Sequence, residues 1–221
     1  MRRYKILIVC CFLCVFIGFT RVDAKKNELP LKGKTIYLDA GHGGADPGAL
    51  YQGIEEKHIN LKITLKLKKS MEEKGARIYL TRDADYDLSK PNAYQRKRSD
   101  LGERARLINV SDCDLYLSVH LNASVHTNWH GGQMFYDDVN EENEKLATIL
   151  QEQFQNDLNS TRKQKRITDL YMYRKAKKPG VLAEVGFLSN PNERYLLQQD
   201  SYQQKIVDTL IRGVLRYFES Q

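Results

Sequence analysis

Histidine and glutamate residues stand at the carboxyl ends of three predicted strands. His42 follows an apolar segment within the glycine-rich loop DAGHGGADPGA, His120 ends the segment LYLSVH, and Glu184 lies in the segment AEVG. A further carboxylate, Glu55 or Glu56, stands at the start of the predicted helix that follows the loop, and the residue types do not choose between the two. Two imidazoles and one carboxylate bind zinc with one position left for water, whereas a closed structural site needs four protein ligands. The pattern therefore indicates a catalytic metal site.

The loop around His42 needs its glycines because a metal ligand on a tight turn beside a cleft requires close backbone approaches that a Cβ atom would obstruct. Gly41, Gly43 and Gly44 supply this freedom. A glycine-rich loop after a first strand can also bind phosphate, but this one matches neither the GxGxxG pattern nor a Walker loop, and it lacks the lysine. A phosphate site is therefore the weaker interpretation.

Predicted strands and helices alternate along the chain. Apolar or β-leaning runs predict strands over Thr35–Leu38, Ala76–Thr81, Leu115–Val119, Gln133–Tyr136 and Val181–Val185. Helices are predicted over Glu56–Lys74, over Asp100–Asn109 with an Asp100/Glu103 capping box, along the stripe from Leu146 to Leu158, and from Ile206 to Phe218. This alternation predicts an α/β fold, a single domain with a mainly parallel twisted sheet flanked by helices on both faces. Ligand sites in such folds gather at the carboxyl ends of the strands.

The N-terminus predicts export. Basic residues at positions 2, 3 and 5 precede fourteen almost wholly apolar residues, Ile6–Phe19. At 1.5 Å per residue this run spans about 21 Å, less than the roughly 30 Å hydrocarbon core of a bilayer, which favours a signal peptide over a membrane-spanning helix. Residues 1–24 are interpreted as a signal peptide or N-terminal anchor, 25–33 as a linker and 34–221 as the catalytic domain. Membrane association is expected only through the N-terminal segment.

The composition limits the classes of partner. Of the formal net charge of +7, a charge of +4 remains without residues 1–24, which suits approach to an anionic cell envelope, and no nucleic-acid-binding module is present. Three of the four cysteines lie in the apolar N-terminal segment, and only Cys113 lies beyond it. The domain is therefore expected to be stabilised by its core, without an internal disulfide.

The motifs resemble those of a known family, the zinc-dependent type-3 N-acetylmuramoyl-L-alanine amidases that cleave bacterial peptidoglycan. In order, these are DAGHGGADPGA, EEKHINL, TRD followed by LGERARLIN, SVHLNA and AEVGFLSNPNE, and they extend over most of residues 33–218. The resemblance implies zinc as cofactor, with His42, Glu56 and His120 as its ligands and Glu184 as the catalytic glutamate. It implies hydrolysis of the amide between N-acetylmuramic acid and L-alanine, which releases stem peptides. Arg82, Arg104, Asn109 and Asp114 match family positions and are expected to hold loops and helices.

Within the family the chain resembles the germination-specific amidases of spore-forming bacteria, which act in formation of cortex muramic lactam. The protein is then expected in the cell envelope, and a cortex role would place it between the spore membranes. Asn122 and Trp129 are candidates for substrate binding, although an exposed loop aromatic without a role is an equally good interpretation of Trp129. Because only three protein ligands would hold zinc in an open cleft, we hypothesise an accessory activating protein. The alternatives are a zinc peptidase acting on wall stem peptides and a non-catalytic wall-binding protein.

Overall fold

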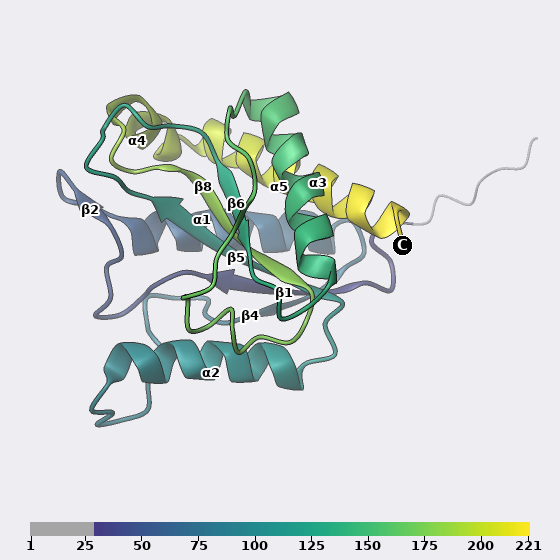
Figure 1. The fold of residues 1–221 in the computed structure, drawn as a ribbon, viewed down its shortest axis with the longest axis horizontal. Coiled ribbons are helices and arrows are strands. Elements are labelled where there is room, and N and C mark those ends of the chain that lie inside the picture. The colour runs from purple at the N-terminus through teal and green to yellow at the C-terminus, as the bar shows by residue number, and fades with distance from the viewer. Residues whose placement is uncertain (1–28) are drawn as a thin grey trace, which may run out of the picture.

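A six-stranded sheet forms the centre of the computed structural model, which describes residues 29–221 (Figure 1). The strand order is β4-β1-β5-β8-β6-β7. In that order the strands are Arg77–Leu80, Thr35–Ala40, Leu115–Asn122, Gly180–Phe187, Gln133–Tyr136 and Lys165–Arg166. The neighbouring strands from β4 to β8 pair in parallel, whereas β6 is antiparallel to β8 and parallel to β7. The mainly parallel sheet expected from the sequence is confirmed.

Helices cover both faces of this sheet (Figure 1). They are α1 Glu56–Glu72, α2 Arg96–Val110, α3 Glu142–Leu158, α4 Pro191–Leu197 and α5 Asp200–Glu219. A short hairpin of β2 Leu50–Tyr51 and β3 Ile54–Glu55 leads into α1. The flanked α/β architecture predicted from the alternating pattern is thus confirmed. No helix in residues 29–221 has the length and apolar character needed to cross a membrane, and the predicted signal peptide or anchor lies outside this range.

One face of the sheet is apolar over β1, β5 and β8, where alternate residues of each strand point to the same side. On this face Leu38, Leu117 and Val119 are buried in a cluster with residues of α1, α3 and α5, among them Leu67 and Phe154. The stripe of α3 and the wide apolar side of α5 predicted from the sequence form this layer together with α1. The main core therefore lies under α1, α3 and α5 and fixes the sheet.

The opposite face changes character along the strands. Near the amino ends of the strands it is apolar, and Tyr37 and Tyr116 pack there with Ile108 of α2 and Met172 of the segment before β8. Near the carboxyl ends the residues that point to this side are polar. They are Asp39 of β1, Ser118 and His120 of β5 and Glu184 of β8. The fold thus collects its polar strand ends on the α2 side of the sheet.

Two predictions of local structure are wrong, and one helix was not predicted. The second helix begins at Arg96, so Asp100 lies inside it and does not form a capping box. The Asp100 carboxylate instead accepts hydrogen bonds from the Leu88 backbone and from Arg104, which attach the preceding loop to the helix. The first helix ends at Glu72, two residues before Lys74. Helix α4 was not predicted, although Asn190 is its N-cap and accepts hydrogen bonds from the Asn192 and Glu193 amides, and Pro191 occupies its first turn.

Candidate active site

Strands β5 and β8 bring His120 and Glu184 together. The two residues are register partners on neighbouring parallel strands, so both side chains project toward the α2 side of the sheet. His42 lies just beyond the end of β1, the next strand in the sheet, and the backbone of Gly41 still pairs with Val119 of β5. The three side chains predicted from strand ends therefore meet at one edge, as the rule for parallel sheets requires.

Glu56 completes the cluster from the first turn of α1. Its Oε2 atom lies 3.2 Å from Nε2 of His42, and its Oε1 atom lies 3.1 Å from Nδ1 of His120. One ligand atom from each of the three residues can be chosen so that all lie within 4.8 Å of one another. Glu55, the alternative carboxylate, faces away and pairs with His58 and Lys57. The structure therefore selects Glu56.

Backbone and side-chain donors fix the Glu56 carboxylate. The amides of Ala49 and Leu121 donate to its two oxygens at 2.9 Å each, and the side-chain amide of Asn60 donates to Oε1 at 3.0 Å. Burial alone raises the pKa of Glu56, but hydrogen bonds and positive charge from His120 and His42 outweigh burial and hold it well below its usual range. The carboxylate is thus ionised and oriented, as a metal ligand must be.

Asp46 orients the imidazole of His42. His42 Nδ1 donates to Asp46 Oδ2 at 2.9 Å, which leaves Nε2 to face Glu56. Burial alone lowers the pKa of His42, but hydrogen bonds to Asp46 and Glu56 and their charges raise it to about 9. The carboxylates around this ring thus favour positive charge at the cluster. A carboxylate behind a ligating histidine is the usual support of a metal site.

Two glycines make room for the cluster. A Cβ atom on Gly41 would lie 2.2 Å from Nε2 of His120, and one on Gly48 would lie 2.5 Å from Oε2 of Glu56. Both distances are shorter than any real Cβ contact, so the loop can pass the two side chains only where it has glycine. His42 itself has a positive φ of 62°, which holds the loop in a left-handed turn.

Two buried arginines clamp the loop that carries His42. Arg104 donates to the carbonyl oxygens of Ala40 and His42, and Arg82 donates to those of Ala40 and Gly41. The guanidinium of Arg104 is itself held by Asp39 and Asp100. Planar guanidinium groups with several fixed donors suit such a clamp. The expectation that Arg82 and Arg104 hold loops and helices agrees with these contacts.

Asp39 is the buried anion of this support. Its carboxylate accepts from Arg104, from Thr81 Oγ1 at 2.7 Å and from Ser118 Oγ at 2.5 Å, and Tyr173 donates to Ser118 in turn. Burial raises the pKa of Asp39, but the Arg104 charge and the two hydroxyl hydrogen bonds lower it to about 2. The network connects β1, β5, α2 and the residue that follows β4.

Glu184 differs from the other carboxylates at this site, Asp39, Asp46 and Glu56, because one of its buried oxygens is unpaired. Its Oε2 atom is buried and has no hydrogen-bond partner among the described residues. Burial, and then the negative charge of Glu56, raises the pKa of Glu184 to about 8, against a smaller lowering by His42. By contrast, the oxygens of the neighbouring Glu193 accept from the Gly131 and Phe187 amides. An orphaned carboxylate beside a metal-type cluster is suited to proton transfer.

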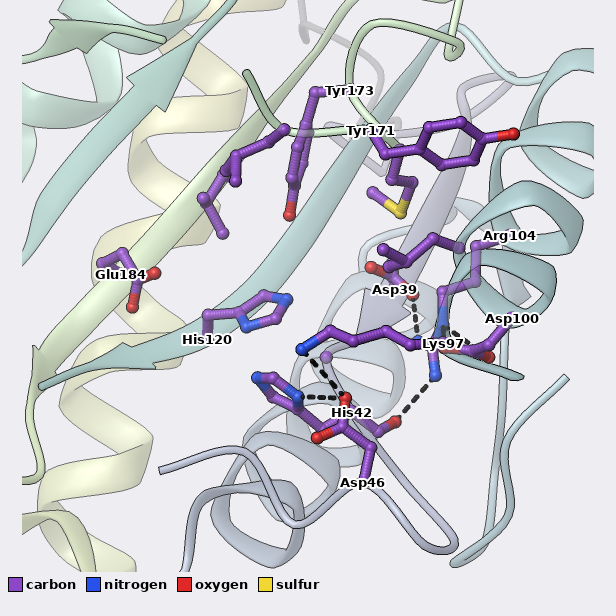
Figure 2. A pocket seen from close by; sticks show the side chains of 15 residues that line it. Asp39, His42, Asp46, Lys97, Asp100, Arg104, His120, Tyr171, Tyr173 and Glu184 are labelled. Carbon is purple, nitrogen blue, oxygen red and sulfur yellow. Dashed lines mark hydrogen bonds and ion pairs between the residues drawn. The ribbon is translucent and has the colours of Figure 1, made fainter. Parts of the chain in front are cut away.

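A cavity of about 220 Å³ opens over these groups (Figure 2). Helix α2 and the segment from Leu170 to Tyr173 form its other walls. A second hollow adjoins the cavity at Glu184, Leu170 and Leu182, and it extends along residues 165–169 to Asn122. The two together form a groove with Glu184 at its middle.

The remaining candidates lie at different distances from this groove. Asn122 lines the second hollow with Glu184. Trp129 lies on the loop after β5, where it packs edge-on against Phe187 and under the guanidinium of Arg162 and lines neither hollow. His58 is exposed and pairs with Glu55, as expected for an ordinary surface histidine.

Asp46 and Lys97 also lie at the site and were not predicted from the sequence. Asp46 had a detectable signal, since it follows His42 by four residues in a glycine-rich loop, where its side chain can turn back to the ring. Lys97 had none, because it is one of three consecutive basic residues and only the placement of α2 turns it into the cavity.

Comparisons with known proteins identify the family. The model of the family described as N-acetylmuramoyl-L-alanine amidase matches residues 36–216. The chain belongs to this family. The amidase is 44% identical over 215 residues to the germination-specific N-acetylmuramoyl-L-alanine amidase of Bacillus subtilis, covering 96% of this chain and 91% of the relative. The resemblance drawn from the motifs is confirmed, and the chain is a hydrolase of this class.

Solved structures give the same result. The CwlD amidase of Clostridioides difficile, solved in complex with the GerS lipoprotein, superposes with a TM-score of 0.81 at 37% identity, covering 85% of this amidase and 100% of that chain. An N-acetylmuramoyl-L-alanine amidase of Clostridium difficile 630 superposes with a TM-score of 0.76 at 27% identity, over 85% and 98% of the two chains. The fold of the amidase is therefore that of its family.

Proposed function

We propose that this amidase hydrolyses the bond between the lactyl group of N-acetylmuramic acid and L-alanine with a zinc ion held by His42, Glu56 and His120 and with Glu184 as the catalytic acid and base. The observation that carries the proposal is the buried, unpaired Oε2 atom of Glu184. Glu184 lines the cavity that both histidines line. A buried carboxylate without a partner is costly unless a bound group or a reaction uses it.

The residues present fit a catalytic zinc site. Two imidazoles and one carboxylate are the donor set of a catalytic zinc site, and one ligand atom from each of the three residues lies within 4.8 Å of the others. Asp46 behind His42 and the amides on Glu56 supply the second layer of support. A zinc ion held there supplies Lewis-acid chemistry that polarises the scissile carbonyl and acidifies water.

Glu184 then moves the proton. Its carboxylate takes a proton from the attacking water as the new C–O bond forms, and it returns the proton to the nitrogen of L-alanine as the C–N bond breaks. The cavity wall from Leu170 to Tyr173 limits access of other water molecules to this step. Asn122, in the second hollow beside Glu184, binds the part of the substrate that lies there, and Trp129 offers a ring face for sugar at the outer rim.

Four variants of the purified protein test these roles. Glu184→Gln is expected to abolish turnover and to keep stoichiometric zinc, whereas His42→Ala and His120→Ala are expected to lose both. His58→Ala removes an exposed imidazole close to Glu56 in sequence and is expected to change neither. Metal analysis with a muropeptide assay reads out both properties. A Glu184→Gln protein that loses zinc, or that still turns over, would overturn the assignment.

We infer a role in the spore cortex from the 44% identity to the germination-specific enzyme of Bacillus subtilis. Export through the N-terminal segment, by a cleaved signal or an anchor, would place the enzyme in the envelope, between the spore membranes. Deleting the gene in its spore-forming host is expected to leave a cortex without muramic lactam. A mutant cortex with the normal muramic lactam content would contradict this role.

We also infer an accessory protein that orders the loops around the metal. Support comes from the three-residue ligand set and from the similar CwlD amidase, which was solved with the GerS lipoprotein. The isolated enzyme is then expected to retain zinc weakly and to turn over slowly. Stoichiometric zinc with rapid turnover of the isolated protein would remove the need for a partner.

A further inference from the structure

Two lysine or arginine side chains line the active-site cavity, Lys97 and Arg104. Arg104 is almost fully buried and all of its nitrogens are engaged, with Asp100, with Asp39 and with the carbonyls of Ala40 and His42. Only one of its five N–H groups, on Nη2, has no acceptor among the described residues, and Arg104 is 1% exposed, so it offers little to a ligand. Lys97 is therefore the cation of this cavity that is free to bind one.

Lys97 projects into the cavity from the first turn of α2, and its ammonium points toward the metal cluster (Figure 2). Its Nζ atom lies 3.6 Å from Oδ2 of Asp46, which is an ion pair longer than a hydrogen bond. Within residues 29–221 this Nζ atom donates no hydrogen bond, so its three N–H groups are available. The start of α2 is held in place because Asp100 and Arg104, one and two turns further on, are anchored to Leu88 and Asp39.

The position of the Lys97 ammonium suits binding of a substrate group that lies near the scissile amide but is not part of it. Lys97 approaches Asp46, which contacts Nδ1 of His42, whereas Nε2 of the same ring faces Glu56. The ammonium and Nδ1 of His42 thus approach the same carboxylate, that of Asp46. An extended peptide advances about 3.3–3.6 Å per residue, so a group one or two residues from the cleaved amide reaches this point.

We propose that Lys97 is a specificity-determining residue that binds a free carboxylate on the residue following L-alanine in the stem peptide. The proposal rests on the function proposed above, because it places the scissile amide between the metal cluster and Glu184. An ammonium that donates no hydrogen bond favours a carboxylate over a neutral carboxamide at the same position, and because the Lys97 side chain is 68% exposed the preference is expected to be modest.

The second hollow offers a competing cation. Lys165 lines it on the far side of Glu184, next to Arg166, which already pairs with Asp138. Lys165 does not line the cavity that holds both histidines. Lys97 and Lys165 can each be replaced by alanine in a separate variant. Comparing Lys165→Ala with Lys97→Ala therefore shows which of the two hollows binds the acidic part of the peptide.

The experiment compares two muropeptides that are identical except for a carboxylate or a carboxamide on the residue after L-alanine. The wild-type enzyme is expected to favour the carboxylate form by about fivefold to tenfold in kcat/KM, mainly through KM, which is the size of a partly exposed charge-assisted hydrogen bond. Lys97→Ala should reduce this preference to less than about twofold with unchanged zinc content, and Lys97→Arg should restore most of it. Lys90→Ala removes a positive charge near α2 outside the cavity and should keep the wild-type preference.

The outcomes separate this inference from the proposed function. A wild-type enzyme that cleaves neither muropeptide contradicts the proposed function itself. An enzyme that cleaves both with equal kcat/KM, or one in which Lys165→Ala rather than Lys97→Ala removes the preference, overturns the assignment of Lys97 alone. Loss of zinc in Lys97→Ala also overturns it, because Lys97 would then support the metal cluster rather than bind substrate.

Discussion

Replacing Gly48 by alanine tests the packing around the metal-ligand residues. Gly48 has a φ of +69°, and a Cβ atom there would lie 2.5 Å from Oε2 of Glu56 and 2.7 Å from Cδ2 of His42. Gly53, in the turn between β2 and β3, has a φ of +79° and nothing within 4 Å of the same position. The two substitutions therefore share the strain of a left-handed alanine, about 1–2 kcal/mol each. They differ because only the Gly48→Ala methyl group would contact the metal-ligand residues.

The size of the effect follows from the displacement. Ordinary contacts begin at 3.4 Å, so the Glu56 oxygen at 2.5 Å must move by about 0.9 Å. Metal sites tolerate ligand displacements of only about 0.2 Å, and disturbing the support of a ligand typically costs 10–100-fold in metal affinity. Gly48→Ala is therefore expected to bind zinc about 10–100-fold more weakly than Gly53→Ala.

Chelator competition on the two purified variants measures zinc affinity, and urea unfolding in the presence of EDTA measures the stability without metal. The unfolding free energies of the two metal-free variants should fall by similar amounts, which separates strain from the loss of zinc. Equal zinc affinities, within about threefold, would refute the inference that Gly48 is required by the geometry of the cluster.

Three further predictions concern the support of the site and the core. Asp46→Asn should weaken zinc binding about 10–100-fold in chelator competition, with little change in fold, because it replaces the carboxylate behind His42; unchanged affinity would exclude that role. The pKa of Asp39 is about 2 in the folded protein and 3.8 in the unfolded chain, so its ionisation contributes about 2 kcal/mol to the free energy of unfolding above pH 3.8. This contribution is lost as the pH falls toward 2. Urea unfolding of the metal-free protein should show the loss, and the Asp39→Asn variant should lack it. Phe154→Ala should cost about 3–5 kcal/mol of unfolding free energy, because this ring of α3 is fully buried in the core, whereas Leu65→Ala on the exposed side of α1 should cost less than about 1 kcal/mol; equal losses would contradict the placement of the core.

The sequence predicted the sheet and the cluster well because both follow from local patterns. Buried strands such as Leu115–Val119 show as short apolar runs, and their parallel pairing brings the residues at their ends to one edge. His42, His120 and Glu184 could therefore be placed together without a structure. The choice of Glu56 over Glu55 needed either the family resemblance or the structure, because both begin the same helix.

The features that were missed depend on contacts between distant parts of the chain. The start of α2 was placed four residues late because Asp100 has the spacing of a capping box, while its carboxylate in fact bonds to Leu88 and Arg104. The arginine clamp on the loop of His42 joins residues 62 positions apart. Side-chain hydrogen bonds over such separations leave no periodicity in the sequence, and the same is true of Lys97 at the cavity.

Mass spectrometry of purified peptidoglycan after digestion with the enzyme tests the central claim most directly. Cleavage of the amide to N-acetylmuramic acid is predicted to release stem peptides with an intact N-terminal L-alanine and to leave glycan strands without peptide. Shortened peptides that remain attached to N-acetylmuramic acid through L-alanine would instead identify a zinc peptidase and contradict the account.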